Sequence, residues 1–400
     1  MYLHKPKFLK SLIFNHYISY YICQENMDGS QRSNSSELTG FSLFALLVVL
    51  VFANAATQAS RFDINFMYYP YLAEELSLSN WQYGCLSGIG FTLVSSICMI
   101  PWGSAADNPS VGIRYVLTCG LLIQCFFGSL QVLSWNFWSL LAFRSGIAAG
   151  QAAIMSPSYA LIGETFKADA GVANGIFSSG FYVGYGILAS FAGFLVATVG
   201  LQWTFVSYSV LCGLASILCY FLVPSENKAK GVDEEKLFES SVITSWLMPV
   251  EPLLLMCAVT LRYFSSVVIS SFLPVYFQQF IAATPDEATK ISVIYGTIAT
   301  VAGAMSTILG GLLTDNLSRA GLGNAAGWVC GASSLAAAVI IVALLFLQLP
   351  AYGVHALLAL LFLATEMWIA PQAIILQVPQ HDFCATARDE RTQPAFKQRR

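Results

Sequence analysis

The feature that most restricts the fold of this chain is a succession of long apolar segments. A helix needs about 20 mainly apolar residues to cross the hydrocarbon core of a bilayer. Segments of this kind run approximately over residues 40–62 (extending as far as 71), 81–104, 115–133, 136–162, 171–199, 202–223, 248–279, 291–314, 324–348 and 353–379. The sequence therefore predicts an all-α polytopic membrane protein with about ten transmembrane helices.

The composition excludes a soluble protein. Hydrophobic residue types make up 56% of the chain and charged types only 10%, whereas a soluble domain carries about 25% charged residues. The chain cannot form a hydrated outer shell, so its outside must face lipid. The net charge of -3 is small and gives no reason to expect a nucleic-acid partner.

The sequence shows no pattern typical of a metal, cofactor or catalytic site. Its ten cysteines are scattered, mostly inside apolar segments, and its four histidines are equally dispersed. Zinc or a disulfide framework would require clustered thiols at fixed spacing. No Walker sequence and no Ser/His or His/Asp cluster at a membrane edge is present. We therefore expect no metal, no cofactor and no enzymatic activity.

A polar stretch divides the chain into two groups of apolar segments. Residues 224–247 are rich in Lys, Asp and Glu and follow the sixth segment, so they are predicted to form a cytosolic linker. Residues 40–223 are expected to form an N-terminal six-helix bundle, and residues 248–379 an incomplete C-terminal bundle of four helices. Residues 1–39 are predicted to be a cytosolic extension, within which Met27 is an alternative start, and residues 380–400 a polar tail.

The distribution of Lys and Arg predicts the orientation, because cytosolic loops of membrane proteins are enriched in these residues. With the N-terminus in the cytosol, every Lys and Arg falls on the cytosolic side except Arg61, Arg144, Arg262 and Lys290. The opposite orientation would place nearly all of them outside. We therefore predict a multi-pass protein with a cytosolic N-terminus, and we expect the sequon at Asn316 to carry no sugar.

An internal repeat links the two groups of segments. The loops after the second and eighth segments share the pattern G-x3-D followed by Arg, at the same place in each six-segment unit. Its residues are Gly103, Asp107 and Arg114 in the first copy, and Gly311, Asp315 and Arg319 in the second. The glycine allows close helix approach, and the carboxylate caps a helix or pairs with a cation to hold a closed state. These six are candidate gating residues.

These loops and the six-plus-six plan resemble the major facilitator superfamily of secondary carriers. The fourth segment, "FRSGIAAGQAAIMSPSYALIGETF", is similar to the fourth helix of that superfamily, and "SRFDINFMYYPYL" resembles the first helix of its spinster-like lipid carriers. The resemblance implies a two-bundle fold. Spinster-like carriers usually have Asp where this chain has Ser60 and Glu where it has Gln151. Because those acids are associated with proton coupling, a coupling mechanism does not transfer directly.

Charged residues inside the apolar segments identify the candidate site, because a charge at the middle of a bilayer costs about 2.5–3.5 kcal/mol on insertion scales. The candidates for substrate binding or coupling are Arg61, Asp63, Arg144, Gln151, Arg262 and Glu366. By resemblance, the helices that carry them line a central cavity. Glu366 is the favoured proton-carrying carboxylate, because burial favours the neutral form of a carboxyl group.

Each of these charges also has a structural interpretation. Arg144 would then only anchor its helix, Arg61 would extend to the outer interface, and Arg262 and Glu366 would neutralise one another. Both interpretations stay open for all four residues. Asn54 and Gln58 lie on a cavity helix and are further candidates for solute contact.

The leading functional hypothesis is a secondary active transporter that works by alternating access. Three arginines in the cavity favour a small organic solute that is anionic or an amphipathic, lipid-like molecule. By resemblance, a complete carrier has two further helices after the tenth segment, and one of them would pair with the second. We therefore expect weak or no transport by this chain unless self-association with another copy covers the missing helices. The alternative is a truncated, non-transporting membrane protein or a receptor-like remnant.

Overall fold

The computed structural model describes residues 40–108, 110–166, 169–224, 250–280, 284–346 and 351–377. It divides the chain into two compact units, residues 1–48 and 49–400. All contacts discussed below lie within the second unit. The predicted N-terminal extension, nearly all of the predicted linker and the predicted polar tail lie outside the described residues.

The described N-terminal helices correspond to the first six predicted segments. They are α3 (Gly40–Met67), α4 (Ala73–Glu75), α5 (Asn80–Gly84), α6 (Gly90–Asp107), α7 (Gly112–Leu130), α8 (Phe137–Gln151), α9 (Met155–Phe166), α10 (Ala170–Tyr182), α11 (Ala192–Val199) and α12 (Leu201–Leu222). Three π-helical turns interrupt them, namely η2 (Tyr68–Leu72), η3 (Cys85–Ile89) and η6 (Val183–Leu188). We call α3 to α12, with these turns, the N-terminal helices.

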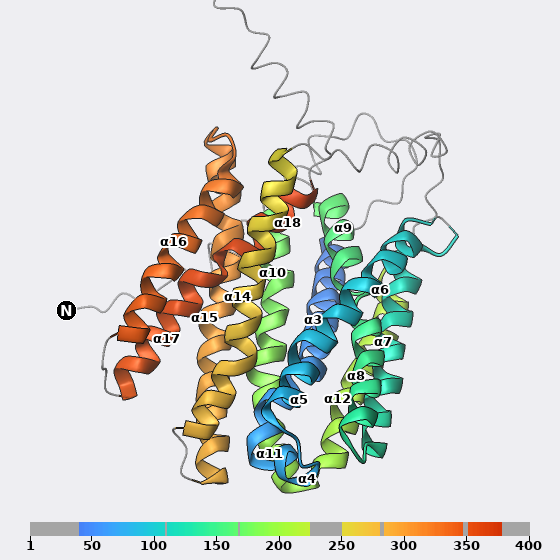
Figure 1. Ribbon diagram of the computed structural model, residues 1–400. Coiled ribbons are helices and arrows are strands. Elements are labelled where there is room, and N and C mark those ends of the chain that lie inside the picture. Colours follow the sequence, from blue (N-terminus) through green and yellow to red (C-terminus); the bar gives the residue numbers. More distant parts are fainter. Residues whose placement is uncertain are drawn as a thin grey trace, which may run out of the picture. The chain divides into compact units, whose positions relative to one another are not determined.

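The C-terminal helices correspond to the last four predicted segments. They are α14 (Val250–Phe280), α15 (Pro285–Arg319), α16 (Ala325–Phe346), α17 (Ala351–Thr365) and α18 (Ile369–Gln377), and a 3-10 turn, η8 (Glu366–Trp368), joins the last two. All regular elements in the described part of the chain are helices, which confirms the predicted all-α class (Figure 1).

Eight of the described helices are long and apolar enough to cross a membrane. A ninth span results if Ala170–Leu188 and Ala192–Val199, which meet at a bend of 42°, are taken together. The fourth predicted segment is split into α8 and α9 by a turn at residues 152–154, so neither piece reaches the length of a spanning helix. The predicted total of ten spans therefore stays a prediction.

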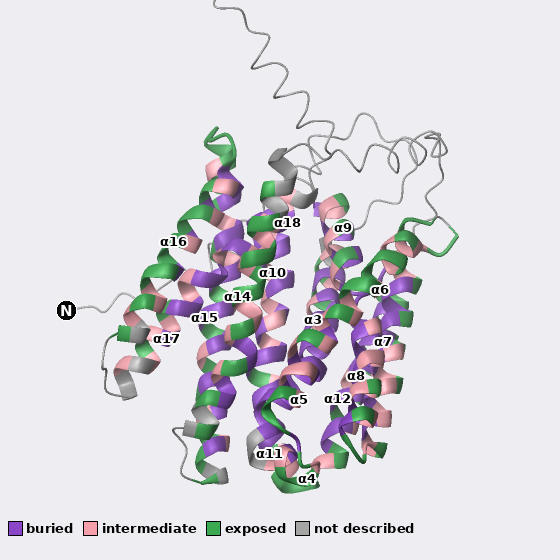
Figure 2. Cartoon of the chain, in the orientation of Figure 1, coloured by how far each residue is buried: buried purple, intermediate pink, exposed green. Residues whose placement is uncertain are grey.

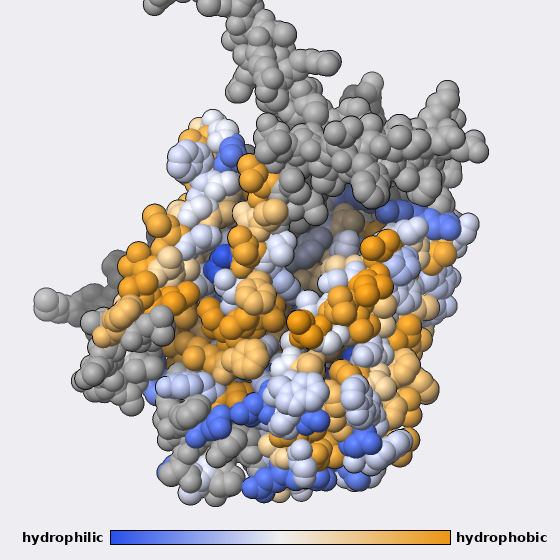
Figure 3. Space-filling model, in the orientation of Figure 1, coloured by the Kyte–Doolittle hydropathy of each residue, from blue (hydrophilic) through white to orange (hydrophobic). Residues whose placement is uncertain are grey.

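Large apolar side chains cover much of the outside. Buried residues lie on the inner faces of the helices (Figure 2), while apolar residues spread over the visible surface (Figure 3). Ile100 on α6 is 77% exposed and Phe346 on α16 is 79% exposed. In water such a surface would be strongly unfavourable, so it fits a lipid environment. The structure is that of a multi-pass integral membrane protein.

Helix α10 with η6 packs along α15 and joins the N-terminal to the C-terminal helices. Small residues allow this close approach. A Cβ atom added at Gly175 would lie 2.7 Å from the carbonyl oxygen of Thr307, and one added at Gly186 would collide with Thr300 and Gly296. A second junction is formed where α14 contacts η2 and η3. These two junctions position the polar residues described next.

Candidate functional site

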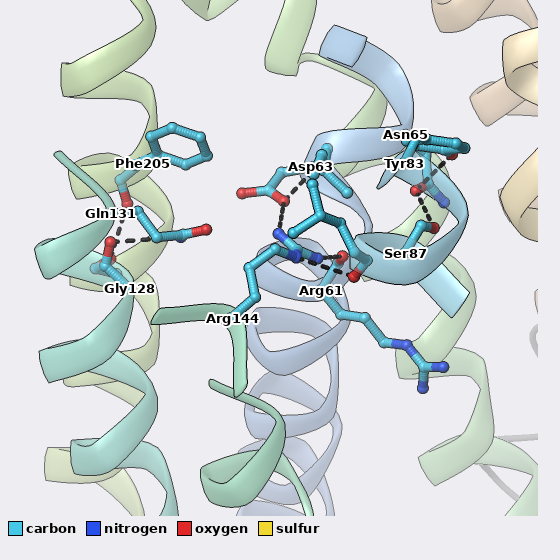
Figure 4. A network of polar contacts seen from close by, with 12 residues as sticks. Arg61, Asp63, Asn65, Tyr83, Ser87, Gly128, Gln131, Arg144 and Phe205 are labelled. Carbon is cyan, nitrogen blue, oxygen red and sulfur yellow. Dashed lines mark hydrogen bonds and ion pairs between the residues drawn. The ribbon is translucent and has the colours of Figure 1, made fainter. Parts of the chain in front are cut away.

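A buried ion pair joins α3 to α8. The Nη1 atom of Arg144 lies 3.2 Å from Oδ1 of Asp63, and the two side chains are 1% and 0% exposed. Figure 4 shows the two side chains directed toward one another. Because an isolated charge in the interior of a membrane protein is costly, each residue offsets the cost of burying the other. The structure thus brings together two residues that the sequence only placed on separate segments.

The remaining nitrogens of Arg144 donate to main-chain oxygens. Nε donates to the carbonyl oxygen of Leu86 at 3.4 Å, and Nη2 donates to the carbonyl oxygen of Arg61. Leu86 lies in the π-helical turn η3, and such turns occur often at functional sites. Arg144 therefore connects α8 to α3 and η3, and each of its three guanidinium nitrogens donates to an acceptor within the protein.

Arg61 is in a different situation. Its side chain is only 6% exposed, yet its Nε and Nη2 atoms have no hydrogen-bond partner among the described residues. The guanidinium carbon lies 4.9 Å from the ring centre of Phe62 and 5.0 Å from that of Phe91. Figure 4 shows the side chain extending away from the Asp63–Arg144 pair. Because α3 continues to Met67, Arg61 lies inside the helix rather than at its end.

Gln151 belongs to a chain of buried amides. Its Nε2 atom donates to Oε1 of Gln58 at 3.2 Å, and Gln58 in turn donates to Asn54. Asn54 donates to the carbonyl oxygen of Phe177 on α10. The Oε1 atom of Gln151 has no hydrogen-bond partner among the described residues. These amides tie α3 to α8 and α10.

A second polar cluster lies among the C-terminal helices. Arg262 on α14 donates to the carbonyl oxygen of Thr365, and its guanidinium carbon lies 5.4 Å from the ring centre of Trp368. The carboxyl group of Glu366 accepts a hydrogen bond of 3.0 Å from the Thr365 hydroxyl. Within the described residues, Arg262 and Glu366 form no ion pair with one another. The hydroxyl of Tyr182 on α10 lies beside Glu366.

The second copy of the loop pattern connects α15 to α10. The Oδ2 atom of Asp315 accepts a hydrogen bond of 2.9 Å from the main-chain amide of Val172, in the first turn of α10. Arg319, one helical turn further on, forms an ion pair with Asp169. A Cβ atom added at Gly311 would collide with the carbonyl oxygen of Gly171. All three predicted residues of this copy therefore lie at one junction.

The first copy is arranged differently. Asp107 is exposed and has neither a hydrogen bond nor an ion pair with any residue that the structure describes. A Cβ atom added at Gly103 would meet nothing within 4 Å. Arg114 donates through Nε to the carbonyl oxygen of Val223 at the end of α12. The two copies share a sequence pattern but not a set of contacts.

Sequence reasoning missed several members of these clusters. Asp169 could have been noticed as an acid directly before a predicted span, where it suits a helix N-terminus. Trp368 lies two positions after Glu366 but gives no separate signal. Tyr182, whose hydroxyl lies beside Glu366, is indistinguishable in the sequence from an aromatic packing residue.

Comparison with known proteins identifies the family. The family model described as Major Facilitator Superfamily matches residues 39–388. No curated protein sequence matches the chain significantly. Two solved structures of a bacterial homologue of the human lysosomal transporter Spinster are similar, both inward-facing, one unoccupied and one occupied. Each is 19% identical and covers 88% of this chain. The TM-score is 0.63 for the unoccupied structure, of which 79% is covered. It is 0.61 for the occupied structure, of which 78% is covered.

These findings confirm the predicted resemblance and the two-bundle fold class. They also confirm that the chain is a membrane transporter and not an enzyme. The chain belongs to the major facilitator superfamily.

Proposed function

We propose that this chain moves an anionic or amphipathic, lipid-like organic solute across the membrane by alternating access, as a secondary active transporter. The observation that carries this proposal is that Arg61 is buried and has no ionic partner among the described residues. A buried guanidinium group without a charged partner is costly in a membrane protein and commonly marks a substrate pathway. Phe62 and Phe91 beside it supply an apolar contact surface. An anionic group attached to an apolar body would satisfy both features.

The helix contacts support a rocking movement. Helix α10 with η6 touches α15 from Gly171 and Gly311 at one end to Gly186 and Gly296 near the other. Such a pair provides an axis about which the N-terminal and C-terminal helices can turn. Figure 3 shows the surface hollowed between α14 and α6, on one side of this axis. The bound solute would lie between Arg61 on α3 and the Arg262–Glu366 cluster on α14 and η8.

Glu366 is our proposed proton-coupling carboxylate. It is 6% exposed, it lies on the C-terminal helices and its neighbour Tyr182 lies on α10 of the N-terminal helices. A change in the charge of Glu366 would therefore alter the contact between the C-terminal helices and α10 of the N-terminal helices. Ser60 and Gln151 are uncharged, so the acids of spinster-like carriers at those positions have no equivalent here.

We also propose that the N-terminus is cytosolic. Asp315, Arg319 and Asp169 then lie at the cytosolic end of their helices, where the basic loop residues gather. Attachment of a sugar to Asn316 during expression in a eukaryotic membrane system would contradict this orientation.

The function is tested by uptake into liposomes containing the purified protein. The probes are a fluorescent single-chain amphiphile with a phosphate headgroup and its uncharged alcohol analogue. We expect uptake of the phosphate compound only, a loss of more than about tenfold in Arg61→Ala, and partial retention in Arg61→Lys. The control is Lys290→Ala, because Lys290 is exposed and outside the clusters.

Three results would contradict the proposal. They are equal uptake of both probes, an Arg61→Ala variant as active as the parent, and binding of the phosphate compound without any uptake. The last of these would indicate a receptor-like protein.

A further inference from the structure

Pro274 leaves one main-chain acceptor of α14 without its usual donor. In an α-helix each carbonyl oxygen accepts from the amide four residues later, and proline has no amide hydrogen. Pro274 lies inside α14, so the carbonyl oxygen of Ser270 lacks its intrahelical hydrogen bond. Ser270 is 6% exposed, and an unpaired buried carbonyl is costly. A donor from elsewhere is therefore required.

The N-terminal helices supply that donor. The hydroxyl of Tyr185 on η6 donates to the Ser270 carbonyl oxygen at 3.0 Å, and Nδ2 of Asn65 on α3 lies 3.4 Å from the same atom. The hydroxyl of Tyr83 on α5 lies 2.7 Å from the carbonyl oxygen of Ser271. Donors from three separate elements thus converge on two consecutive carbonyl groups.

Other buried residues fix these donors in place. The single hydroxyl proton of Tyr83 faces two acceptors, the Ser271 carbonyl oxygen and Oδ1 of Asn65 at 2.9 Å, and the latter also accepts from Ser87 at 2.7 Å. Figure 4 shows Tyr83, Asn65 and Ser87 grouped together. The hydroxyl of Tyr295 lies 2.9 Å from that of Tyr185. Contacts with residues outside α14 therefore help to position these donors.

We propose that Asn65, Tyr83 and Tyr185, together with the Ser270 and Ser271 carbonyl groups, form a reversible latch that closes the predicted outer end of the transporter. This α14 latch lies near the end of α3 and the start of α5. It rests on the proposed alternation between two states. When the C-terminal helices turn away, the three hydrogen bonds break, and the Ser270 carbonyl becomes available to water.

Neutral hydrogen bonds suit this reversible role. Breaking one changes a folding equilibrium by about two- to twelvefold when solvent can replace the partner. This change is small enough for the N-terminal and C-terminal helices to separate and close again. The apolar surroundings add specificity. The ring of Tyr83 stacks on that of Tyr68 at 4.3 Å, and Phe272 meets it edge-on at 5.9 Å. In the closed state these rings exclude water from the latch.

The test measures the distance between two positions at the predicted outer end and needs no solute. Spin labels are placed on Glu75→Cys and Lys290→Cys, both at exposed positions, in a cysteine-free background. Distance distributions are then recorded by pulsed electron resonance in lipid nanodiscs. We expect Tyr185→Phe to raise the population of the longer, open distance about fivefold, because one hydrogen bond of ordinary strength is lost. We expect Pro274→Ala to act in the same direction, because alanine has the amide hydrogen that proline lacks and restores the internal donor to the Ser270 carbonyl.

The matched control is Tyr208→Phe. Its hydroxyl also donates to a main-chain oxygen, that of Leu188 at 2.6 Å, but both residues belong to the N-terminal helices. We expect this variant to keep the parental distances. Equal distributions for Tyr185→Phe and Tyr208→Phe would overturn the latch. A shift in Tyr185→Phe without one in Pro274→Ala would overturn the role of Pro274. Because no transport is measured, these outcomes are independent of whether the proposed solute is correct.

Discussion

The carboxylate of Asp315 accepts a hydrogen bond from the main-chain amide of Val172, although 143 positions separate the two residues. Amide groups in the first turn of a helix have no partner inside the helix and carry partial positive charge. Asp315 therefore caps α10 from α15, and the ion pair between Arg319 and Asp169 lies one turn away. This arrangement binds the two halves of the transporter at the end opposite the α14 latch.

The first prediction concerns this cap. Asp315→Ala should lower the free energy of unfolding by about 1.5–3 kcal/mol, because a hydrogen bond to a charged group is lost. Asp107→Ala, at the matching position of the first loop copy, should change it by less than about 0.5 kcal/mol, because Asp107 is exposed. Thermal unfolding in detergent measures both. Equal destabilisation by the two variants would show that the cap does not hold the helices together.

A second matched pair tests the close approach of α10 and α15. Gly311→Ala introduces a methyl group that collides with the carbonyl oxygen of Gly171, whereas Gly103→Ala introduces one into open space. We expect Gly311→Ala to destabilise the protein by about 1–3 kcal/mol. Gly103→Ala should be neutral or stabilise it by up to about 1 kcal/mol, since alanine favours a helix. The same unfolding assay separates them, and the opposite order would contradict the observed packing.

A third prediction concerns Asp63 and Arg144. Asp63→Ala and Arg144→Ala should each cost about 3–5 kcal/mol, because each leaves an uncompensated buried charge. The double variant should cost clearly less than the sum of the two. Arg61→Ala should not destabilise the protein, since it removes a buried charge that has no ionic partner among the described residues. Strictly additive losses in the double-mutant cycle would show that the two residues are not coupled.

The fourth prediction tests the proposed coupling residue. Glu366→Gln should abolish uptake of the phosphate amphiphile driven by an imposed pH gradient, because the amide cannot carry a proton. Exchange of the same solute between equal pH values should persist, since that reaction needs no net proton movement. Glu75→Gln is the control, because Glu75 is exposed on α4. Loss of both reactions, or of neither, would assign the coupling elsewhere.

The fold was predictable because the signal for a membrane helix is long and local. The segment predicted at residues 324–348 is α16, Ala325–Phe346, and the one at residues 202–223 is α12, Leu201–Leu222. Breaks inside segments were not predicted. The turn at residues 152–154 and the 42° bend before Ala192 depend on packing between helices, which leaves no periodic pattern in the apolar residues.

The candidate site was predictable as a list of residues but not as a set of contacts. Charges inside apolar segments are conspicuous, so Asp63 and Arg144 were both found, but their pairing depends on how α3 lies against α8. The sequence grouped Arg262 with Glu366, whereas Arg262 donates to the Thr365 carbonyl oxygen. A main-chain acceptor has no sequence signature. The latch was not predicted for the same reason, because its acceptors on α14 are main-chain carbonyl groups.

The π-helical turn η3 has a consequence for comparing this chain with its relatives. A π-helical turn holds one residue more than the α-helical turn it replaces, and one residue corresponds to about 100° around a helix axis. Tyr83 precedes η3 and Phe91 follows it, so the turn sets the angle between the ring at the latch and the ring beside Arg61. An alignment against a relative with a regular helix here must place a single-residue gap inside the membrane span Asn80–Asp107. Without that gap, every position beyond it would be assigned to the wrong side of the helix.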